Sequence, residues 1–464
     1  MKKLIFNLKI MLIVFLALSL MLTGGLILQQ HRSKTRLAVA AGENLVSLRQ
    51  RYSQAGSIYD INGEILAHSD NGIRLYHEND LTAQAVLHTV GDYTQRIDNT
   101  IETRYQPVLL GNSRNILHQL WLDVKGKGLG GDDITLTLDS DLTTQAYKLL
   151  GSRRGSIVLL NYKTGEIIVS ASAPSVNPQN VIEYIDIPDT SLFNRSLRGS
   201  YAPGSVFKLV TAYAWLNSEK YDPRFHVVCA GESTIHPDYA NENGDGHGDV
   251  DFTSAFAKSC NVFFGEVGVL LGQEELLAAA SELGIGTGYQ VDLLNGAVSS
   301  IQCEDSDYLL SWLSVGQPTD SSVLSMSPIE MARLAGGIAN SGVVMESHII
   351  DHLTDPEGRK YQKLKISEDR RIMNVETASK IEELMIEAVK TGTGSSAAVD
   401  GLVVAGKTGT VQVEGQDNNA LFCGYIVSDE YPYAITVVIE EGISGGGQAA
   451  PAAAEILSWA VDRE

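Results

Sequence analysis

Segments that read as β-strands stand far apart in this chain, on both sides of a long helical stretch. Two of them, 155–161 and 165–172, flank a turn at 162–165, and the other three follow only at 402–413, 421–427 and 433–441. Two strands, then helices, then three strands and a terminal helix favour an α+β domain. Its antiparallel sheet is then assembled from both ends of the chain.

The residues between these strands carry the apolar spacing of helices, and a helix also closes the chain. The predicted helices are 205–216, 252–272, 274–284, 327–342, 377–390 and 449–463. A strand-like segment, "ITLTL" (134–138), and a helix, 140–150, are predicted to open this domain. We therefore expect one large domain over 134–464, with a helical subdomain beside the sheet.

The N-terminal region predicts a membrane anchor. Residues 10–28 form an uncharged run of nineteen residues, long enough to span the roughly 30 Å hydrocarbon core as a helix. The run is longer than the apolar part of a usual signal peptide. Residues 1–9 are then a short tail. Basic residues balance across the run, so they do not decide its orientation: Lys2, Lys3 and Lys9 before it, Arg32, Lys34 and Arg36 after it.

We predict that residues 29–133 form a small membrane-proximal pedestal domain. Within it, "GSIYDINGEILAHS" (56–69) reads as a hairpin that turns at Asn62-Gly63. Residues 70–130 are polar and show no strong period. A glycine-rich stretch, 125–133, marks the predicted boundary with the large domain.

Composition and motifs argue against a nucleic-acid partner, a disulfide framework and a metal site. A net charge of −21 argues against nucleic acid, which needs a basic surface. Cys229, Cys260, Cys303 and Cys423 show neither a disulfide framework nor zinc spacing. The loop 241–251 resembles a calcium loop but has Phe252 where the last ligand belongs, so a solvated turn is expected. No metal or cofactor is predicted.

Lys208 is the only charged residue between Gly204 and Asn217, within an apolar helix. A buried ammonium is costly unless it is paired or does chemistry. Ser205 precedes it by one turn, so the two side chains share a face of the helix. Pro203-Gly204 suits a helix start, where free N–H groups stabilise negative charge. Ser205 and Lys208 therefore form a candidate nucleophile and base.

Two further short motifs follow in the chain. Ser259-Cys260-Asn261 lies inside the predicted helix 252–272, and Lys407-Thr408-Gly409-Thr410 follows the strand-like "LVVAG". Each motif is weak alone. The glycine permits close approach of a ligand backbone, and the lysine and threonines suit a carboxylate.

In this order, with gaps of about fifty and then about 150 residues, the three motifs are those of serine acyl-transferases that react with penicillin. The chain resembles the class B, monofunctional penicillin-binding proteins over roughly residues 135–460. The flanks that carry the likeness include "FNRSLRGSYAPGSVFK", "HGDVDFTSAFAKSCNVFF" and "WLSVGQPTDSSVLSMSPIEMARLAGGIANSG". "AGSIYDINGEILA" resembles the family's membrane-proximal motif, with Ala55 where an arginine is usual.

The resemblance implies a penicillin-binding, serine β-lactamase-like fold and a role for each motif residue. Ser205 is expected to be the acylated nucleophile and Lys208 its base. Ser259 is expected to relay a proton, and Asn261 to position Lys208 and the donor amide. Lys407, Thr408 and Thr410, with Gly409, are expected to bind the terminal carboxylate. The N–H groups of Ser205 and Thr410 would form an oxyanion hole.

The expected activity is peptidoglycan D,D-transpeptidation through a Ser205 acyl-enzyme, with β-lactam antibiotics as inhibitors. The alternatives are a D,D-carboxypeptidase or hydrolase of the same fold, or a scaffold with slow catalysis. The expected partners are stem peptides and a polytopic membrane glycosyltransferase. Crosslinking happens outside the cytoplasm, so we expect a single-pass membrane protein with its catalytic domain outside. A role in cell division or cell shape is consistent with this activity.

Overall fold

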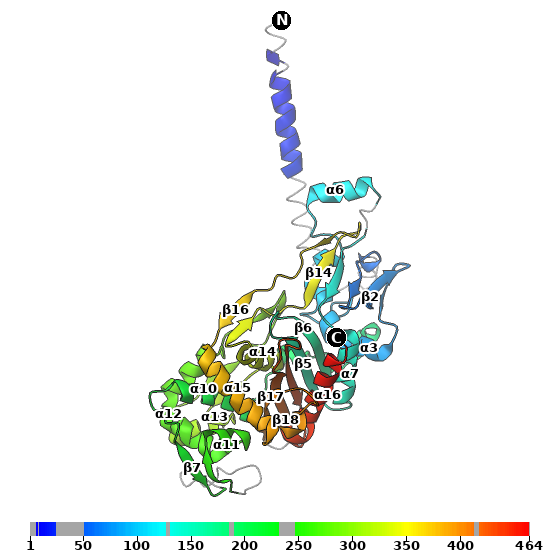
Figure 1. Cartoon of the computed structure of the whole chain (residues 1–464). Coiled ribbons are helices and arrows are strands. Elements are labelled where there is room, and N and C mark those ends of the chain that lie inside the picture. Colours follow the sequence, from blue (N-terminus) through cyan, green and yellow to red (C-terminus); the bar gives the residue numbers. More distant parts are fainter. Residues whose placement is uncertain are drawn as a thin grey trace.

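The computed structural model describes residues 6–7, 9–24, 51–126, 130–184, 190–231, 246–412 and 417–463. Its centre is a five-stranded antiparallel sheet in the order β17-β18-β19-β5-β6 (Figure 1). The strands are β5 (Gly155–Asn161), β6 (Ile167–Ala173), β17 (Val404–Val411), β18 (Asn419–Ile426) and β19 (Tyr433–Ile439). β19 pairs directly with β5. The prediction of a sheet assembled from both ends of the domain is confirmed.

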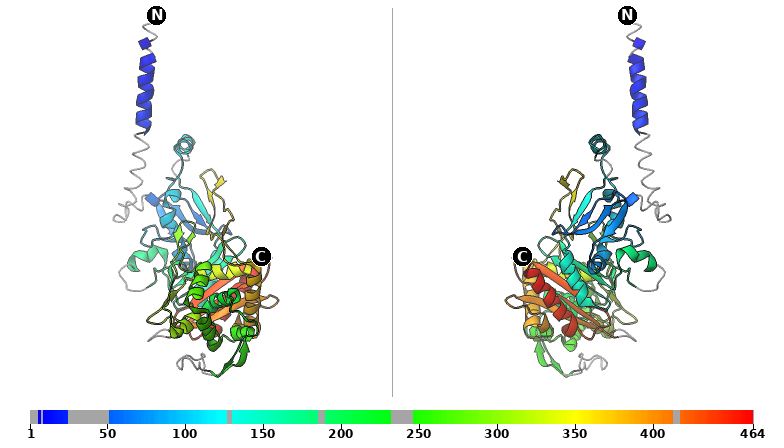
Figure 2. Two further views of the ribbon diagram at one scale, coloured as in Figure 1. Left: turned by 90° about the vertical axis from the view of Figure 1, so that its left-hand side faces the viewer. Right: turned by 90° about the vertical axis from the view of Figure 1, so that its right-hand side faces the viewer.

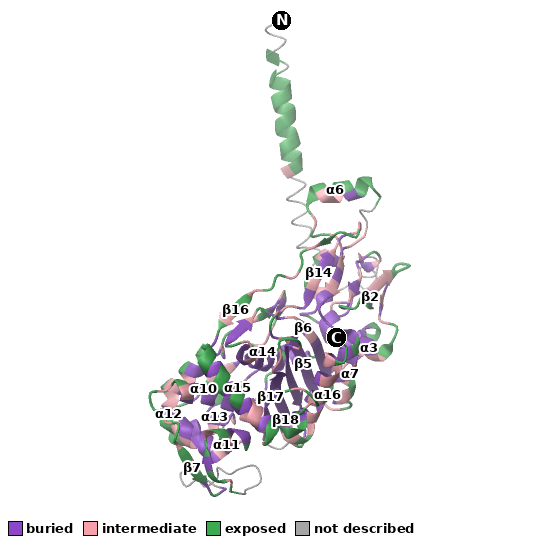
Figure 3. Cartoon of the chain, in the orientation of Figure 1, coloured by how far each residue is buried: buried purple, intermediate pink, exposed green. Residues whose placement is uncertain are grey.

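Both faces of this sheet are buried (Figure 3). Successive side chains of a strand point to opposite faces. Accordingly, Ile157 and Leu159 belong to one core, with α7 (Ser140–Leu150) and α16 (Ala450–Val461). Val158 and Leu160 belong to the other, with α14 (Pro328–Ala339). The sheet is therefore a rigid middle layer between helices.

A helical subdomain adjoins the β17 end of the sheet (Figure 1). It consists of η2 (Gly204–Phe207), α10 (Lys208–Asn217), α11 (Phe252–Ala257), α12 (Asn261–Glu282), α13 (Asp307–Ser314) and α15 (Val375–Lys390). The single helix predicted at 252–272 is wrong, because the chain breaks between α11 and α12 at Ser259. A second break lies within α12 at Gly272, whose φ is 81°.

A second sheet has six strands in the order β15-β14-β4-β1-β2-β3. It lies on the side of the central sheet that is nearer the N-terminus (Figure 2). Its strands are β1 (Ile58–Tyr59), β2 (Ile65–Asp70), β3 (Ile73–Tyr76), β4 (Asp133–Leu136), β14 (Ile350–Thr354) and β15 (Lys360–Tyr361). The strand predicted at 134–138 is present as β4 and belongs to this sheet, not to the central one. Ile134 lies opposite Ile58 on β1 and Leu353 on β14. Local pattern identifies a strand, but only long-range pairing chooses its sheet.

The predicted hairpin at 56–69 is confirmed. β1 pairs antiparallel with β2, and Gly63 adopts φ 86° in the turn. A second hairpin joins β2 to β3 through Asn71 and Gly72, which have φ values of 48° and 79°. The sequence carries the same Asn-Gly turn signal at 71–72, within the region 70–130 that showed no strong period.

Residues 9–24 are helical, and most of their large apolar side chains are exposed. Among the residues that the structure describes, no helix is both long enough and apolar enough to cross a bilayer. Residues 25–28 of the predicted anchor lie outside the described residues, as do 29–50 of the predicted pedestal. The same holds for residues 127–129 of the predicted boundary and for 241–245 of the calcium-like loop.

Shorter elements complete the fold. The helices are α3 (Asp80–Val90), α4 (Ile101–Arg104), α5 (Gln106–Leu109), α6 (Ile116–Val124), η1 (Pro178–Asn180), α8 (Val181–Tyr184), α9 (Arg195–Arg198), η3 (Ser395–Ala397) and η4 (Gly445–Ala449). The short strands pair as β7 (His226–Cys229) with β8 (Gly248–Asp251), β9 (Gln290–Val291) with β10 (Leu294–Asn295), β11 (Ser300–Gln302) with β12 (Val323–Ser325), and β13 (Val343–Met345) with β16 (Glu368–Arg371).

Candidate active site

Ser205 lies in a tight 3₁₀ turn that leads into α10. The backbone N–H of Lys208 donates to the Ser205 carbonyl, and Gly204 starts the turn at φ 53°. In a 3₁₀ turn, residues i and i+3 eclipse each other, so the two side chains share one side. Ser205 is half-buried, whereas Lys208 is fully buried. The prediction of an α-helix at Ser205 is wrong in detail, but the shared face is retained.

The Ser259 turn connects α11 to α12. Ser259 has φ 55°, a left-handed conformation that is uncommon for a residue with a side chain. Its N–H donates to Phe256 O at 3.1 Å, and the N–H of Cys260 donates to Ala255 O at 2.8 Å. Cys260 caps α12, and Asn261 is the first residue of that helix. The helix break presents both Ser259 and Asn261 to Lys208.

The Lys208 ammonium is held by this turn. Its Nζ donates to Ser259 O at 2.8 Å, to Asn261 Oδ1 at 2.8 Å and to Ser259 Oγ at 3.2 Å. Its Nζ also lies 5.5 Å from the centre of the Phe264 ring. As an ammonium, Lys208 has three N–H donors for these three acceptors; as a neutral amine it has two N–H donors and one lone pair. The apolar helix tolerates this lysine because the Ser259 turn supplies its acceptors.

Lys407, on β17, reaches the same serine from the other side. Its Nζ donates to Ser259 Oγ at 2.9 Å and to Thr408 O at 3.1 Å. The side chain is fully buried. Ser259 Oγ therefore lies between two lysines and can accept from both through its two lone pairs, with its own O–H left to donate. This is the geometry of a hydroxyl that can pass a proton.

The open edge of the central sheet faces Ser205. β17 is the terminal strand, and in an antiparallel strand the N–H and C=O of one residue point to the same side. The Thr410 carbonyl accepts from Gln317 Nε2 at 3.1 Å and lies beside Gly204, away from β18. The Thr410 N–H therefore also faces outward, toward the turn that carries Ser205. An acyl oxygen between these elements can receive that N–H.

The hydroxyls of Thr408 and Thr410 have partners within the protein. Thr408 Oγ1 shares a hydrogen bond of 2.6 Å with Thr393 Oγ1, and Thr410 Oγ1 accepts from the N–H of Gly445 at 3.3 Å. Thr393 and Gln317 contact motif residues, but sequence reasoning did not identify them. Gln317 lies in a flank that carries the family likeness, but neither residue was assigned a role.

Gly409 permits the close approach of β17 to the Ser205 turn. A Cβ at this position would lie 2.8 Å from Pro203 O and 3.3 Å from Val206 Cγ2. Gly409 was predicted to let a ligand backbone approach closely. In this structure the backbone that approaches it is that of the Ser205 turn. The structure thus brings together Ser205, Lys208, Ser259, Asn261 and the four residues 407–410, as the sequence motifs require.

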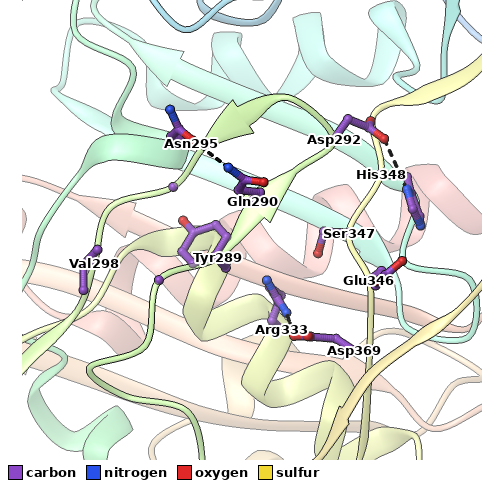
Figure 4. A pocket seen from close by; sticks show the side chains of 12 residues that line it. Tyr289, Gln290, Asp292, Asn295, Val298, Arg333, Glu346, Ser347, His348 and Asp369 are labelled. Atoms are coloured by element: carbon purple, nitrogen blue, oxygen red, sulfur yellow. Dashed lines mark hydrogen bonds and ion pairs between the residues drawn. The ribbon is translucent and has the colours of Figure 1, made fainter.

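A cavity of about 860 Å³ lies elsewhere, between β9, β10, α14 and β16 (Figure 4). None of the motif residues lines it. Arg333 and Asp369 form an ion pair on one side of this cavity, and His348 Nδ1 lies 3.3 Å from Asp292. Its chemistry is unrelated to a nucleophilic serine, so its size does not make it the active site.

The model of the penicillin binding protein transpeptidase domain matches residues 155–458, which include all three motifs. Peptidoglycan D,D-transpeptidase PbpA of Mycolicibacterium smegmatis is 26% identical over 441 residues, covering 87% of this chain and 88% of the relative. Stage V sporulation protein D of Bacillus subtilis is 27% identical over 398 residues, covering 77% of this chain and 59% of the relative.

Solved structures share the fold. The D,D-transpeptidase domain of a peptidoglycan glycosyltransferase from Eggerthella lenta superposes with a TM-score of 0.76 at 26% identity, covering 89% of this chain and 99% of that one. Penicillin-binding protein A from M. tuberculosis, in an imipenem acyl-enzyme complex, has a TM-score of 0.79 at 24% identity and covers 89% of this chain and 100% of that one.

Proposed function

The chain belongs to the penicillin-binding protein transpeptidase family, and we propose on that premise how its own residues perform acyl transfer. It is a class B penicillin-binding protein and a peptidoglycan D,D-transpeptidase. One observation carries the assignment of roles. Two buried lysines, Lys208 and Lys407, converge on Ser259 Oγ, and Lys208 shares its side of the turn with Ser205.

Acylation begins with proton removal from Ser205 Oγ. Two ammonium groups on one hydroxyl repel each other, so the arrangement favours a neutral amine at one lysine. Lys208, one turn from Ser205, is the amine that takes the proton. Oγ then bonds to the carbonyl carbon of the penultimate D-alanine, and the oxyanion receives the N–H groups of Ser205 and Thr410. Each such donor contributes about 3–4 kcal/mol to the transition state.

Collapse of the oxyanion breaks the peptide C–N bond and releases D-alanine. The leaving nitrogen needs a proton, and the Ser259 O–H can supply it while Lys208 or Lys407 restores it. An amine from a neighbouring stem peptide then attacks the ester, and the same groups act in reverse. Asn261 Oδ1 accepts from Lys208 Nζ at 2.8 Å, which makes Asn261 a positioning residue.

The terminal carboxylate of the donor is placed at the Lys407–Thr410 segment. Lys407 supplies positive charge there, and the outward backbone groups of β17 offer hydrogen bonds to an extended peptide. The Thr408 and Thr410 hydroxyls can reach a ligand only by exchanging their present partners, Thr393 and Gly445. β-lactams, which the M. tuberculosis relative binds covalently, are expected to acylate Ser205 in the same way.

We propose further that the N-terminal run 10–28 anchors the protein in the cell membrane with the catalytic domain outside. The uncharged sequence and the exposed apolar side chains of 10–22 support this proposal. Peptidoglycan crosslinking outside the cytoplasm determines the orientation. A polytopic membrane glycosyltransferase is the proposed partner, contacting residues 10–130, and wall synthesis for division or shape is the proposed setting.

Intact mass of the purified full chain tests the proposal. After incubation with a penicillin and washout, we expect one adduct, on the Ser205 peptide, lasting many minutes. Ser205→Ala should carry none, and Ser300→Ala, which changes a half-buried serine outside the site, should carry the wild-type adduct. Loss of the adduct within seconds would favour the hydrolase alternative. No adduct on folded protein would favour the scaffold.

A further inference from the structure

Three side chains that the sequence separates widely meet behind the Ser259 turn. The ligand atoms of Cys229, His247 and Cys260 all lie within 4.8 Å of one another. Cys229 ends β7, His247 immediately precedes β8, and Cys260 caps α12. Both cysteines are buried, and neither forms a disulfide. The sequence showed no zinc spacing because the hairpin partner of β7 and the start of α12 bring these residues together only in the fold.

The geometry suits a small, soft, tetrahedral ion. Zinc binds cysteine sulfur at about 2.3 Å and histidine nitrogen at about 2.0–2.1 Å, which places tetrahedral ligand atoms roughly 3.5–3.8 Å apart. Cys229 Sγ and His247 Nδ1 already lie 3.8 Å apart. The remaining separations, all below 4.8 Å, need side-chain adjustments of about 1 Å or less to match. Two sulfurs and an imidazole favour the binding of zinc over that of calcium or magnesium.

Binding of such an ion changes the protonation of the cluster. A bound zinc ion deprotonates its coordinating thiols. Two thiolates then balance the charge of the ion, and both protons leave to solvent.

We propose that Cys229, His247 and Cys260 form a structural site for one zinc-type divalent cation. The site ties the β7–β8 hairpin to the start of α12. Cys260 stands between Ser259 and Asn261, so the ion also fixes the left-handed turn that presents these residues to Lys208. The proposal does not depend on which acyl transfer Ser205 performs.

Metal analysis of the full chain tests this proposal. Reduced wild-type protein, metal-depleted and then dialysed against Zn²⁺, is expected to retain about one zinc per chain. Loading with Co²⁺ alone should produce the intense sulfur-to-cobalt absorption and visible bands of a tetrahedral thiolate site. Cys229→Ser and His247→Gln should each weaken zinc binding by at least about tenfold. Cys303→Ser, a buried cysteine outside the cluster, is the matched control and should bind as wild type does.

Three outcomes would overturn the proposal. The first is wild-type protein, reduced and folded by circular dichroism, that retains no zinc and gives no cobalt–sulfur absorption. The second is equal metal content in wild type and in both cluster variants. The third is a Cys229–Cys260 disulfide, detected in unreduced protein as a linked peptide that persists when Zn²⁺ is present during purification. The cobalt spectrum of the wild type decides the question even where a variant fails to fold.

Discussion

Replacement of Gly409 by alanine tests how closely β17 must approach the Ser205 turn. The new Cβ would lie 2.8 Å from Pro203 O and 3.3 Å from both Val206 Cγ2 and Leu421 Cβ. Favourable heavy-atom contacts lie at about 3.5–4.0 Å, so β17 and the turn must separate by roughly 0.5–1 Å. Pro203 O belongs to the backbone of the turn, which cannot rotate aside as a flexible side chain could.

That separation displaces Ser205 from the Thr410 N–H and from the Ser259 turn. A misplacement of about 1 Å costs on the order of 100-fold in rate. We therefore expect Gly409→Ala to lower the rate constant of acylation by a fluorescent penicillin by about 10- to 100-fold. Overpacking should lower the free energy of unfolding by only about 1–3 kcal/mol. Stopped-flow fluorescence measures the first quantity, and denaturant unfolding measures the second.

Gly288→Ala is the matched control, because its added Cβ meets its nearest atom, Val298 Cγ2, at an ordinary 3.6 Å. It should acylate as wild type does. The reasoning is refuted if Gly409→Ala acylates within about threefold of the wild-type rate, whatever its stability, since the approach of β17 would then not position Ser205.

Ser259→Ala removes the oxygen shared by Lys208 and Lys407, so acylation should slow by about 10²- to 10⁴-fold in the same assay; a wild-type rate would exclude the proton relay. Burial raises the pKa of Glu330 from 4.5 to about 7, so folded protein binds more protons than unfolded protein between these values and stability falls as pH rises through them. Glu330→Gln keeps the capping box of α14 and should recover at most about 3 kcal/mol above pH 7, seen as a higher Tm there but not at pH 4. Burial lowers the pKa of His88 from 6.5 to about 4, so unfolded protein binds more protons and stability is lost as pH falls from 6.5 to 4. His88→Gln can still donate to Ser191 O and should flatten that decline in Tm; an unchanged slope would contradict the assignment.

The sequence by itself determined the helices, strands and turns that depend only on neighbouring residues. Helices and strands repeat every few residues, so a segment such as 140–150 shows its helix without knowledge of the fold, and α7 has these bounds. Asn62-Gly63 likewise specifies a turn by its own conformational freedom. Because the predicted strands lie at both ends of the domain, we expected them to meet in one central sheet. The order of the three motifs pointed to the chemistry of the site.

Tertiary structure alone decided how these pieces meet. No local pattern shows that 134–138 joins β1 and β14, because both pairings are long-range. The helix predicted through Ser259 breaks where Lys208 and Lys407, from other elements, donate to the oxygens of the turn. Cys229, His247 and Cys260 are adjacent for the same reason. Sequence periodicity reports which face a residue occupies, whereas contact between faces depends on the packing of the whole chain.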